Sequence, residues 1–102
     1  MTTTYQDTRD NIMYSEDIDL FDARDTAYSW HSGQRSALYS FASTGCVIQD
    51  EDHRASLLGE VQECLDIVRG RLAAPPYSED ACDQLDALDN LYRAAEALPA
   101  RN

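Results

Sequence analysis

The chain has 102 residues, including 19 Asp or Glu, eight Arg and no Lys, and its formal net charge is −11. This length suits one domain, and no stretch approaches the ~20 apolar residues that span a bilayer. Because so negative a protein repels nucleic acid and anionic membranes, we expect neither as a direct partner.

Residues 1–14 are polar and show no period, which predicts a flexible N-terminal arm. They lack the basic leader and apolar run of an export signal, so we expect a cytoplasmic protein. A helical pattern starts at Ser15, with Ser15 or Asp17 as the predicted N-cap. The apolar residues that define this first helix recur mostly in steps of three and four: Ile18, Leu20, Phe21, Ala23, Ala27, Tyr28 and Trp30.

Gly33 predicts a break, after which Ser32 would cap a second helix that ends at Gly45. The small residues of this helix predict a face that another helix can approach closely: Ser36, Ala37, Ser40 and Ser43. Residues 46–48 form a short apolar connector.

Two heptad-patterned helices follow. The first begins near the acidic run 50–52 and ends at Pro75-Pro76, and the second is capped by Ser78 and continues to Pro99. Their predicted apolar stripes are Leu58, Val61, Leu65, Val68 and Leu72, and then Ala81, Leu85, Leu88, Tyr92 and Ala95. A short proline turn between two such stripes predicts an antiparallel hairpin. We therefore expect an all-α bundle of four helices over residues 15–102, with three helices and a longer arm as the alternative.

The sequence predicts no metal site, no cofactor and no enzyme activity. Cys46, Cys64 and Cys82 lack the paired spacing of zinc ligands or of a disulfide framework, so we expect reduced thiols, the last two beside the apolar stripes. His31 is surrounded by serines, but no carboxylate lies in its window and the G-x-S-x-G elbow is absent.

Acidic residues form two ladders with steps of three. The ladders are Glu16, Asp19, Asp22 and Asp25, and then Asp80, Asp83, Asp86 and Asp89. Residues three apart on a helix are about 5–6 Å apart at Cβ, so a ladder resembles a row of phosphates, although each step also turns by about 60°. Only Asp89 has a clear i+4 partner, Arg93. The ladders therefore predict contact with a basic protein surface, unless the acidity is genomic or halophilic background.

Residues 26–49 contain no Asp or Glu but include four of the chain's aromatic residues. This window predicts either a covered central helix or an uncharged contact surface. In the second case Trp30, Arg35 and Tyr39 would lie at its centre, because interfaces favour these residue types.

Within this window, WHSGQRSALYSFASTG resembles a stretch in small acidic uncharacterised proteins carried by bacterial plasmids, phages and integrated elements. Size, acidity and helical pattern are also similar to those of phage-borne anti-CRISPR and anti-restriction inhibitors. This resemblance implies an inhibitor that binds a basic nucleic-acid-binding surface of a host defence complex. The alternative is a small homodimeric structural or adaptor protein whose acidity is background.

Overall fold

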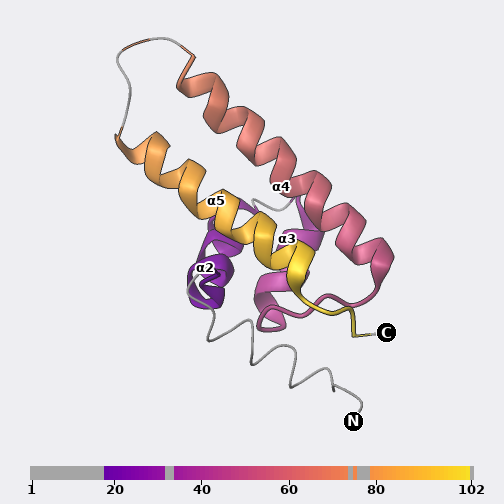
Figure 1. The fold of residues 1–102 in the computed structure, drawn as a ribbon. Helices are drawn as coiled ribbons and strands as arrows, with labels where there is room; N and C mark the ends of the chain where they lie inside the picture. The colour runs from indigo at the N-terminus through magenta and orange to yellow at the C-terminus, as the bar shows by residue number, and fades with distance from the viewer. Residues whose placement is uncertain (1–17, 32–33, 74, 76–78, 102) are drawn as a thin grey trace.

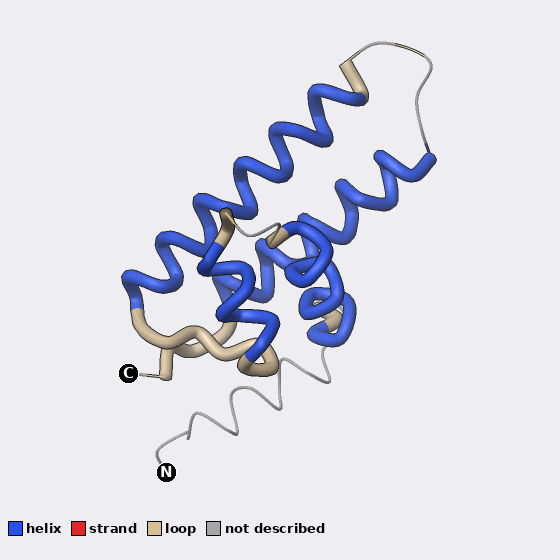
Figure 2. Tube along the Cα trace, turned by 180° about the vertical axis from the view of Figure 1, so that it is seen from behind, coloured by secondary structure: helices blue, strands red, loops and turns tan. Residues whose placement is uncertain are grey.

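The computed structural model describes residues 18–31, 34–73, 75 and 79–101, and these residues form four α-helices (Figure 1). The helices are α2 (Leu20–Trp30), α3 (Ser36–Ser43), α4 (Glu51–Arg71) and α5 (Glu79–Ala97). No described segment is drawn as a strand in Figure 2, and the only strand-like pairing among the described residues is an isolated parallel bridge between Ile48 and Ala100. The predicted all-α fold of four helices is confirmed.

The long helices α4 and α5 pack side by side in opposite directions, as the heptad patterns predict. The shorter α2 lies against α5 and α3, and α3 lies against α4. Figures 1 and 2 show α2 and α3 gathered against one half of the α4–α5 hairpin, while its other half extends beyond them. The helix α3, which belongs to the acid-free window, therefore lies against α2 and α4.

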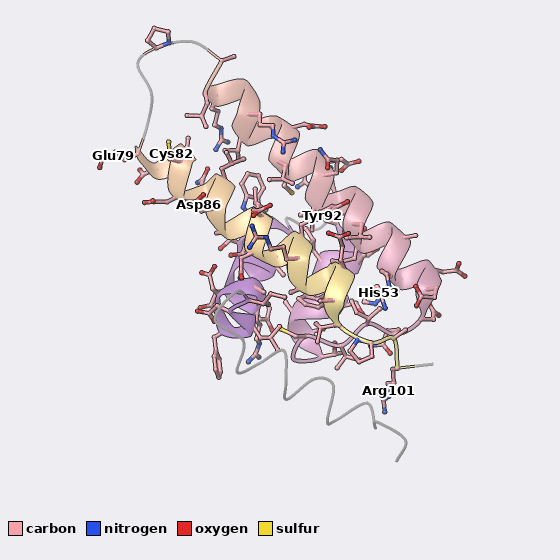
Figure 3. All side chains as sticks on the ribbon, in the orientation of Figure 1. His53, Glu79, Cys82, Asp86, Tyr92 and Arg101 are labelled. Carbon is pink, nitrogen blue, oxygen red and sulfur yellow. The ribbon has the colours of Figure 1, made fainter. Side chains whose placement is uncertain are left out.

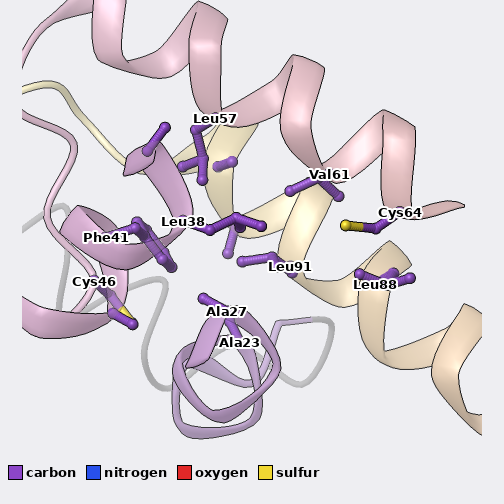
Figure 4. Packing of buried hydrophobic residues seen from close by; sticks show 14 of the residues in the cluster. Ala23, Ala27, Leu38, Phe41, Cys46, Leu57, Val61, Cys64, Leu88 and Leu91 are labelled. Carbon is purple, nitrogen blue, oxygen red and sulfur yellow. The ribbon is translucent and has the colours of Figure 1, made fainter. Parts of the chain in front are cut away.

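The hydrophobic core lies where all four helices meet (Figure 4). Three helices contribute large, fully buried members: Leu38 and Phe41 of α3, Leu57 and Val61 of α4, and Leu88 and Leu91 of α5. Ala23 and Ala27 of α2 are also fully buried, and their small side chains let α2 approach the others closely.

The buried faces differ in detail from the predicted stripes. In α4, Leu57 and Cys64 are buried, whereas Leu58 and Leu72 only pack at the edge of the core. In α5, Leu91 and Ala94 are buried and Leu85 and Tyr92 are partly exposed. In α3, the buried face is Ala37, Leu38, Phe41 and Ala42, while Ser36 and Ser43 are exposed, so the predicted small-residue face was wrong. Cys82 is exposed instead of lying against the core.

The helix boundaries correct several predicted caps. The N-cap of α2 is Asp19, not Ser15 or Asp17, because the Asp19 carboxylate accepts the backbone N–H of Phe21 at 3.0 Å and of Asp22 at 3.1 Å. Ser15, Asp17, Ser32, Ser78 and the predicted arm over residues 1–14 lie outside the described residues. Gly45 has a φ of 73°, which confirms a left-handed residue after α3.

Side chains of α4 hold the start of α3 in place. The N-cap of α3, Arg35, provides no side-chain cap, and Glu60 instead accepts the backbone N–H groups of Ala37 at 3.3 Å and Leu38 at 3.1 Å. His53 Nδ1 accepts the Gln49 N–H at 3.0 Å, so the ring proton lies on Nε2, which donates to the Ala37 carbonyl at 3.1 Å. These contacts fix α3 to α4 across residues that are distant in sequence.

The end of α5 is fixed in the same way. Arg54 of α4 donates through Nη1 to the carbonyls of Ala95 at 2.6 Å and Glu96 at 3.1 Å, where a cation also complements the helix dipole. Beyond α5, Leu98 is fully buried, and the Arg101 N–H donates to the Ile48 carbonyl at 2.7 Å. The last described residues are therefore part of the packed structure.

Candidate protein-binding surface

Five aspartates of the neighbouring helices α2 and α5 are exposed on the outside of the bundle. Asp22 and Asp25 are exposed on α2, and Asp80, Asp83 and Asp86 are exposed on α5. Figure 3 shows Asp86 on the edge of α5 that lies away from α4. None of these five carboxylates forms an ion pair with another described residue. We call these five residues the acidic surface.

The remaining ladder residues have other surroundings. Asp89 pairs with Arg93 at 3.2 Å, as the i+4 spacing predicts, and the carboxylate of Asp19 is used as the cap of α2. Glu16 lies outside the described residues. The acidic surface is therefore smaller than the two ladders together.

A reciprocal pair of hydrogen bonds sets the alignment of α2 against α5. The Asp19 N–H donates to Asn90 Oδ1 at 2.9 Å, and Asn90 Nδ2 donates to the Asp19 carbonyl at 2.7 Å. The start of α2 is thus placed beside the middle of α5, and its end lies near the first turns of α5. This antiparallel alignment turns a carboxylate from each ladder toward the same space.

That space is an open groove of about 330 Å³ between α2 and α5. One wall comes from α2 and the other from α5, and the lining residues are Asp22, Thr26, Ser29, Trp30, Asp83, Gln84 and Ala87. Arg71 of α4 lies at one end, with its guanidinium carbon 6.0 Å from the Trp30 ring centroid and its Nη1 3.0 Å from Gln84 Oε1. The groove combines two carboxylates with hydroxyl groups and one aromatic ring.

The protonation equilibrium of Asp22 reflects this crowding. Burial raises the pKa of the Asp22 carboxyl above its ordinary value of 3.8, and the negative charges of Asp19 and Asp25 raise it further. The first turn of a helix favours negative charge, but these effects outweigh that preference here. The folded chain therefore favours the protonated, neutral form of the Asp22 carboxyl more than the unfolded chain does.

We expect Asp22→Asn to raise the free energy of unfolding at pH 7. Because the pKa of Asp22 is higher in the folded chain than in the unfolded chain, ionisation of Asp22 destabilises the fold, and this effect disappears as the pH falls through the raised pKa. Urea unfolding at a series of pH values measures the difference between variant and wild type. It should be largest near pH 7 and absent below about 3.8. Asp86→Asn, which removes one charge away from the groove, is the control, and an equal gain in both variants would contradict the assignment.

The three predicted contact residues of the acid-free window have different environments. Trp30 is half-buried beside the groove, whereas the Tyr39 side chain is 53% exposed on α3. The Arg35 side chain is only 18% exposed. Its Nη1 donates to the Trp30 carbonyl at 3.2 Å, and its Nε lies 3.9 Å from the Glu63 carboxylate. Arg35 therefore joins α2 to α4, and Tyr39 is the more accessible of the three.

Phe21, Tyr28 and Tyr39 form an exposed aromatic surface on α2 and α3, and the sequence pattern missed its two members on α2. Phe21 is 70% exposed and Tyr28 is 40% exposed, although both were assigned to the buried side of the first helix. The ring of His31 meets Tyr28 and Tyr39 edge-on, at centroid distances of 6.3 Å and 5.3 Å. The seven-residue spacing of Phe21 and Tyr28 places them on one face, one position away from the buried residues of α2, and this offset is the signal that could have separated them.

A second open pocket of about 300 Å³ lies beside this aromatic surface, lined by His31, Arg35, Ser36 and Tyr39. Neither a carboxylate nor a thiol is among its lining residues. Cys46 and Cys64 are buried, and burial raises the pKa of the Cys64 thiol. Across the described ranges, no group of three His, Cys, Asp or Glu side chains is arranged to hold a metal ion.

Comparison with protein-family models, curated proteins and solved structures finds no match to this chain. Among the described helices, none has both the length and the apolar composition needed to cross a membrane.

Proposed function

We propose that this chain is a non-catalytic interaction protein whose acidic surface occupies a basic surface of a nucleic-acid-handling complex. The observation that supports this function is that one carboxylate from each ladder, Asp22 and Asp83, lines the groove between α2 and α5. Like charges held together without counter-ions destabilise a protein, and a cationic partner relieves that repulsion. The resemblance of residues 30–45 to proteins of mobile elements makes a bacterial defence complex the proposed target.

The aromatic surface would contribute specificity to this interaction. Phe21 and Tyr28 are exposed on α2, which carries two of the five residues of the acidic surface, and Tyr39 is exposed on the neighbouring helix α3. Charge complementarity mainly accelerates association, whereas buried aromatic side chains at an interface slow dissociation. A partner would therefore be attracted by the aspartates and retained by the aromatic rings.

Neutralising the ladder of α5 tests the proposal. We expect the fourfold variant Asp80→Asn, Asp83→Asn, Asp86→Asn and Asp89→Asn to bind its partner about tenfold less tightly or worse, because each exposed ion pair contributes about 0.2–1 kcal/mol. Proteins captured from a bacterial lysate by immobilised wild-type chain would be identified by mass spectrometry. Their affinities for wild type and variant would then be measured across a salt series. The variant should also show a weaker salt dependence.

A charge-matched control distinguishes the acidic surface from net charge. Substituting the exposed acids Asp52, Glu63, Asp66 and Glu96 by their amides removes the same four charges from other parts of the bundle. This control should retain most of the affinity, and nucleic acid should displace the captured protein. Equal losses in both fourfold variants, or no loss in either, would contradict the proposal.

A homodimeric adaptor is the second candidate, and the aromatic surface favours it. Since the stripes of α4 and α5 are largely used within the bundle, a second copy would dock on Phe21, Tyr28 and Tyr39 instead. Light scattering after size-exclusion chromatography at low and high salt separates the two functions. A dimer that Phe21→Ser dissociates would support the adaptor, and a monomer at all protein concentrations would exclude it.

A further inference from the structure

The outward face of α2 has no other described element over it. Figure 4 shows Ala23 and Ala27 pointing from α2 into the core, and the opposite side of the helix carries the exposed residues Phe21, Asp25 and Tyr28. The two rings are seven positions apart, so they lie on one side of α2 and are separated by about 10.5 Å along its axis. Two large rings exposed in one row on a small domain indicate a contact surface.

This face continues onto α3 and into a pocket. The His31 ring meets Tyr28 and Tyr39 edge-on, and His31 and Tyr39 also line the open pocket of about 300 Å³ together with Arg35 and Ser36. The ring edges favour an apolar side chain in this pocket. The guanidinium in its lining disfavours a cationic one.

The charge on the outward face itself has the opposite sign. Asp25 lies between the two rings of α2 and Asp22 lies beside it, and neither forms an ion pair with another described residue. The single Arg of α2, Arg24, is used within the bundle: its Nε donates to the Ala42 carbonyl at 3.2 Å. Its guanidinium carbon lies 5.7 Å from the Tyr28 ring centroid. A partner that covers these rings must therefore bring cations to the two carboxylates, because burying them without compensation is costly.

The backbone around this face determines which kind of segment can cover it. The described residues of α2 and α3 offer no strand edge, since their N–H and C=O groups are paired along each helix. An extended peptide would bury backbone groups without hydrogen-bond partners here, whereas a helix pairs its own. Side chains seven positions apart on a partner helix also repeat at about 10.5 Å, which matches the rise between Phe21 and Tyr28.

We infer that the outward face of α2 binds a basic amphipathic helix of the partner. The helix lies along α2, and its apolar side chains pack on Phe21 and Tyr28. Its Arg or Lys side chains pair with Asp22 and Asp25, and one further apolar side chain enters the pocket beside Tyr39. This inference rests on the proposed function and names the partner's element. Charge complementarity argues against a second copy of this chain, which would add a net charge of −11 to the same face.

Three end-blocked peptides of about 18 residues, or about five helical turns, test the inference with the isotope-labelled full chain and NMR. The first repeats leucines in steps of three and four among lysines and arginines. The second has the same composition with the leucines distributed around the helix, and the third is the first with glutamates in place of its cations. We expect the first to bind saturably and to shift the amide signals of Phe21, Asp25 and Tyr28, and the other two to bind at least tenfold more weakly.

Each peptide can contradict one part of the inference. Equal binding of the first and second peptides would overturn the amphipathic helix, and equal binding of the first and third would overturn charge complementarity. Failure of the first to bind saturably would overturn the inference as a whole. The proposed function would still stand, because its test uses the captured partner and the ladder of α5.

Matched alanine variants locate the binding face. Phe21→Ala and Tyr28→Ala each remove an exposed ring of α2, and Ile67→Ala removes a side chain that is 41% exposed on α4. We expect each of the first two to weaken the first peptide about fivefold to tenfold, because aromatic side chains dominate interface energies, and Ile67→Ala to change it less than twofold. An equal effect of all three variants would refute the assignment to α2.

Two single-charge variants test the carboxylate between the rings. Asp25→Asn should weaken the first peptide about threefold, whereas Asp86→Asn, with the same change in net charge on α5, should weaken it less than about 1.5-fold. Equal effects would contradict the contact at Asp25. Light scattering tests the other occupant of this face: a wild-type dimer that Phe21→Ala dissociates would assign the face to a second copy and overturn the inference.

Discussion

Phe41→Ala should destabilise the fold by about 3–5 kcal/mol, the range for removing a fully buried phenylalanine. Phe41 lies on α3 with no exposed surface, and it is among the largest side chains of the core (Figure 4). Small domains have only about 5–15 kcal/mol of total stability, so this substitution should remove a large part of it. Urea unfolding followed by circular dichroism measures the change.

Phe21→Ala is the matched control for this experiment. It deletes the same phenyl ring from a residue that is 70% exposed, and the expected change in unfolding free energy is within about 0.5 kcal/mol. If both alanine variants lost the same stability, the assignment of Phe41 to the core and Phe21 to the surface would be wrong. This control variant also separates effects on partner binding from effects on folding.

Glu60→Ala should cost about 2–3 kcal/mol, because hydrogen bonds to a charged group contribute about 1.5–3 kcal/mol. Both carboxylate oxygens of Glu60 accept backbone N–H groups at the start of α3, a helix of 8 residues without a side-chain cap of its own. Without Glu60 these donors lose their partner in a partly buried position. Urea unfolding gives the loss, and amide hydrogen exchange at Ala37 and Leu38 should accelerate.

Two further substitutions sharpen this result. Glu60→Gln keeps one acceptor oxygen and should lose about half as much stability as Glu60→Ala. Glu63→Ala removes a mostly exposed carboxylate from the same helix, 3.9 Å from Arg35, and should change stability by less than about 0.5 kcal/mol. A wild-type stability for Glu60→Ala would show that α3 does not depend on this contact.

The helices were predictable from sequence because each carries a local signal. Gly45 after α3 and the acidic residues at the start of α4 and α5 act within a single turn, so their effect is visible without the rest of the chain. Choosing between competing signals was not possible locally. Ser15, Asp17 and Asp19 are all good capping residues, but Asp19 is also held by Asn90, which is 71 positions away.

Buried faces were harder to predict than helices. Leu57 and Leu58 both fit a heptad pattern, and α4 buries Leu57 more completely because α3 as well as α5 packs against it. Phe21 counts as apolar in any pattern, yet its face of α2 has no helix over it among the described elements. Apolar periodicity reports an available face, and only the packing of the other helices determines which residues are covered.

The candidate site combines a predictable and an unpredictable part. The two aspartate ladders are evident in the sequence, and so is the shortage of compensating arginines. The meeting of Asp22 with Asp83 across a groove depends on the alignment of α2 with α5. Spacing alone describes a row of charges along one helix, whereas recognition depends on how two rows face each other.

The main-chain pairing of Ile48 with Ala100 and Arg101 has a consequence for synthesis of the chain. Leu98 fills part of the core, and Arg54 needs the end of α5 to satisfy its donors. The native packing therefore cannot close while residues 98–101 are still inside the ribosome. Until then, the earlier segments of the chain lack the residues that they pack against in the folded state. The high negative charge of these segments makes nascent chains repel one another during that interval.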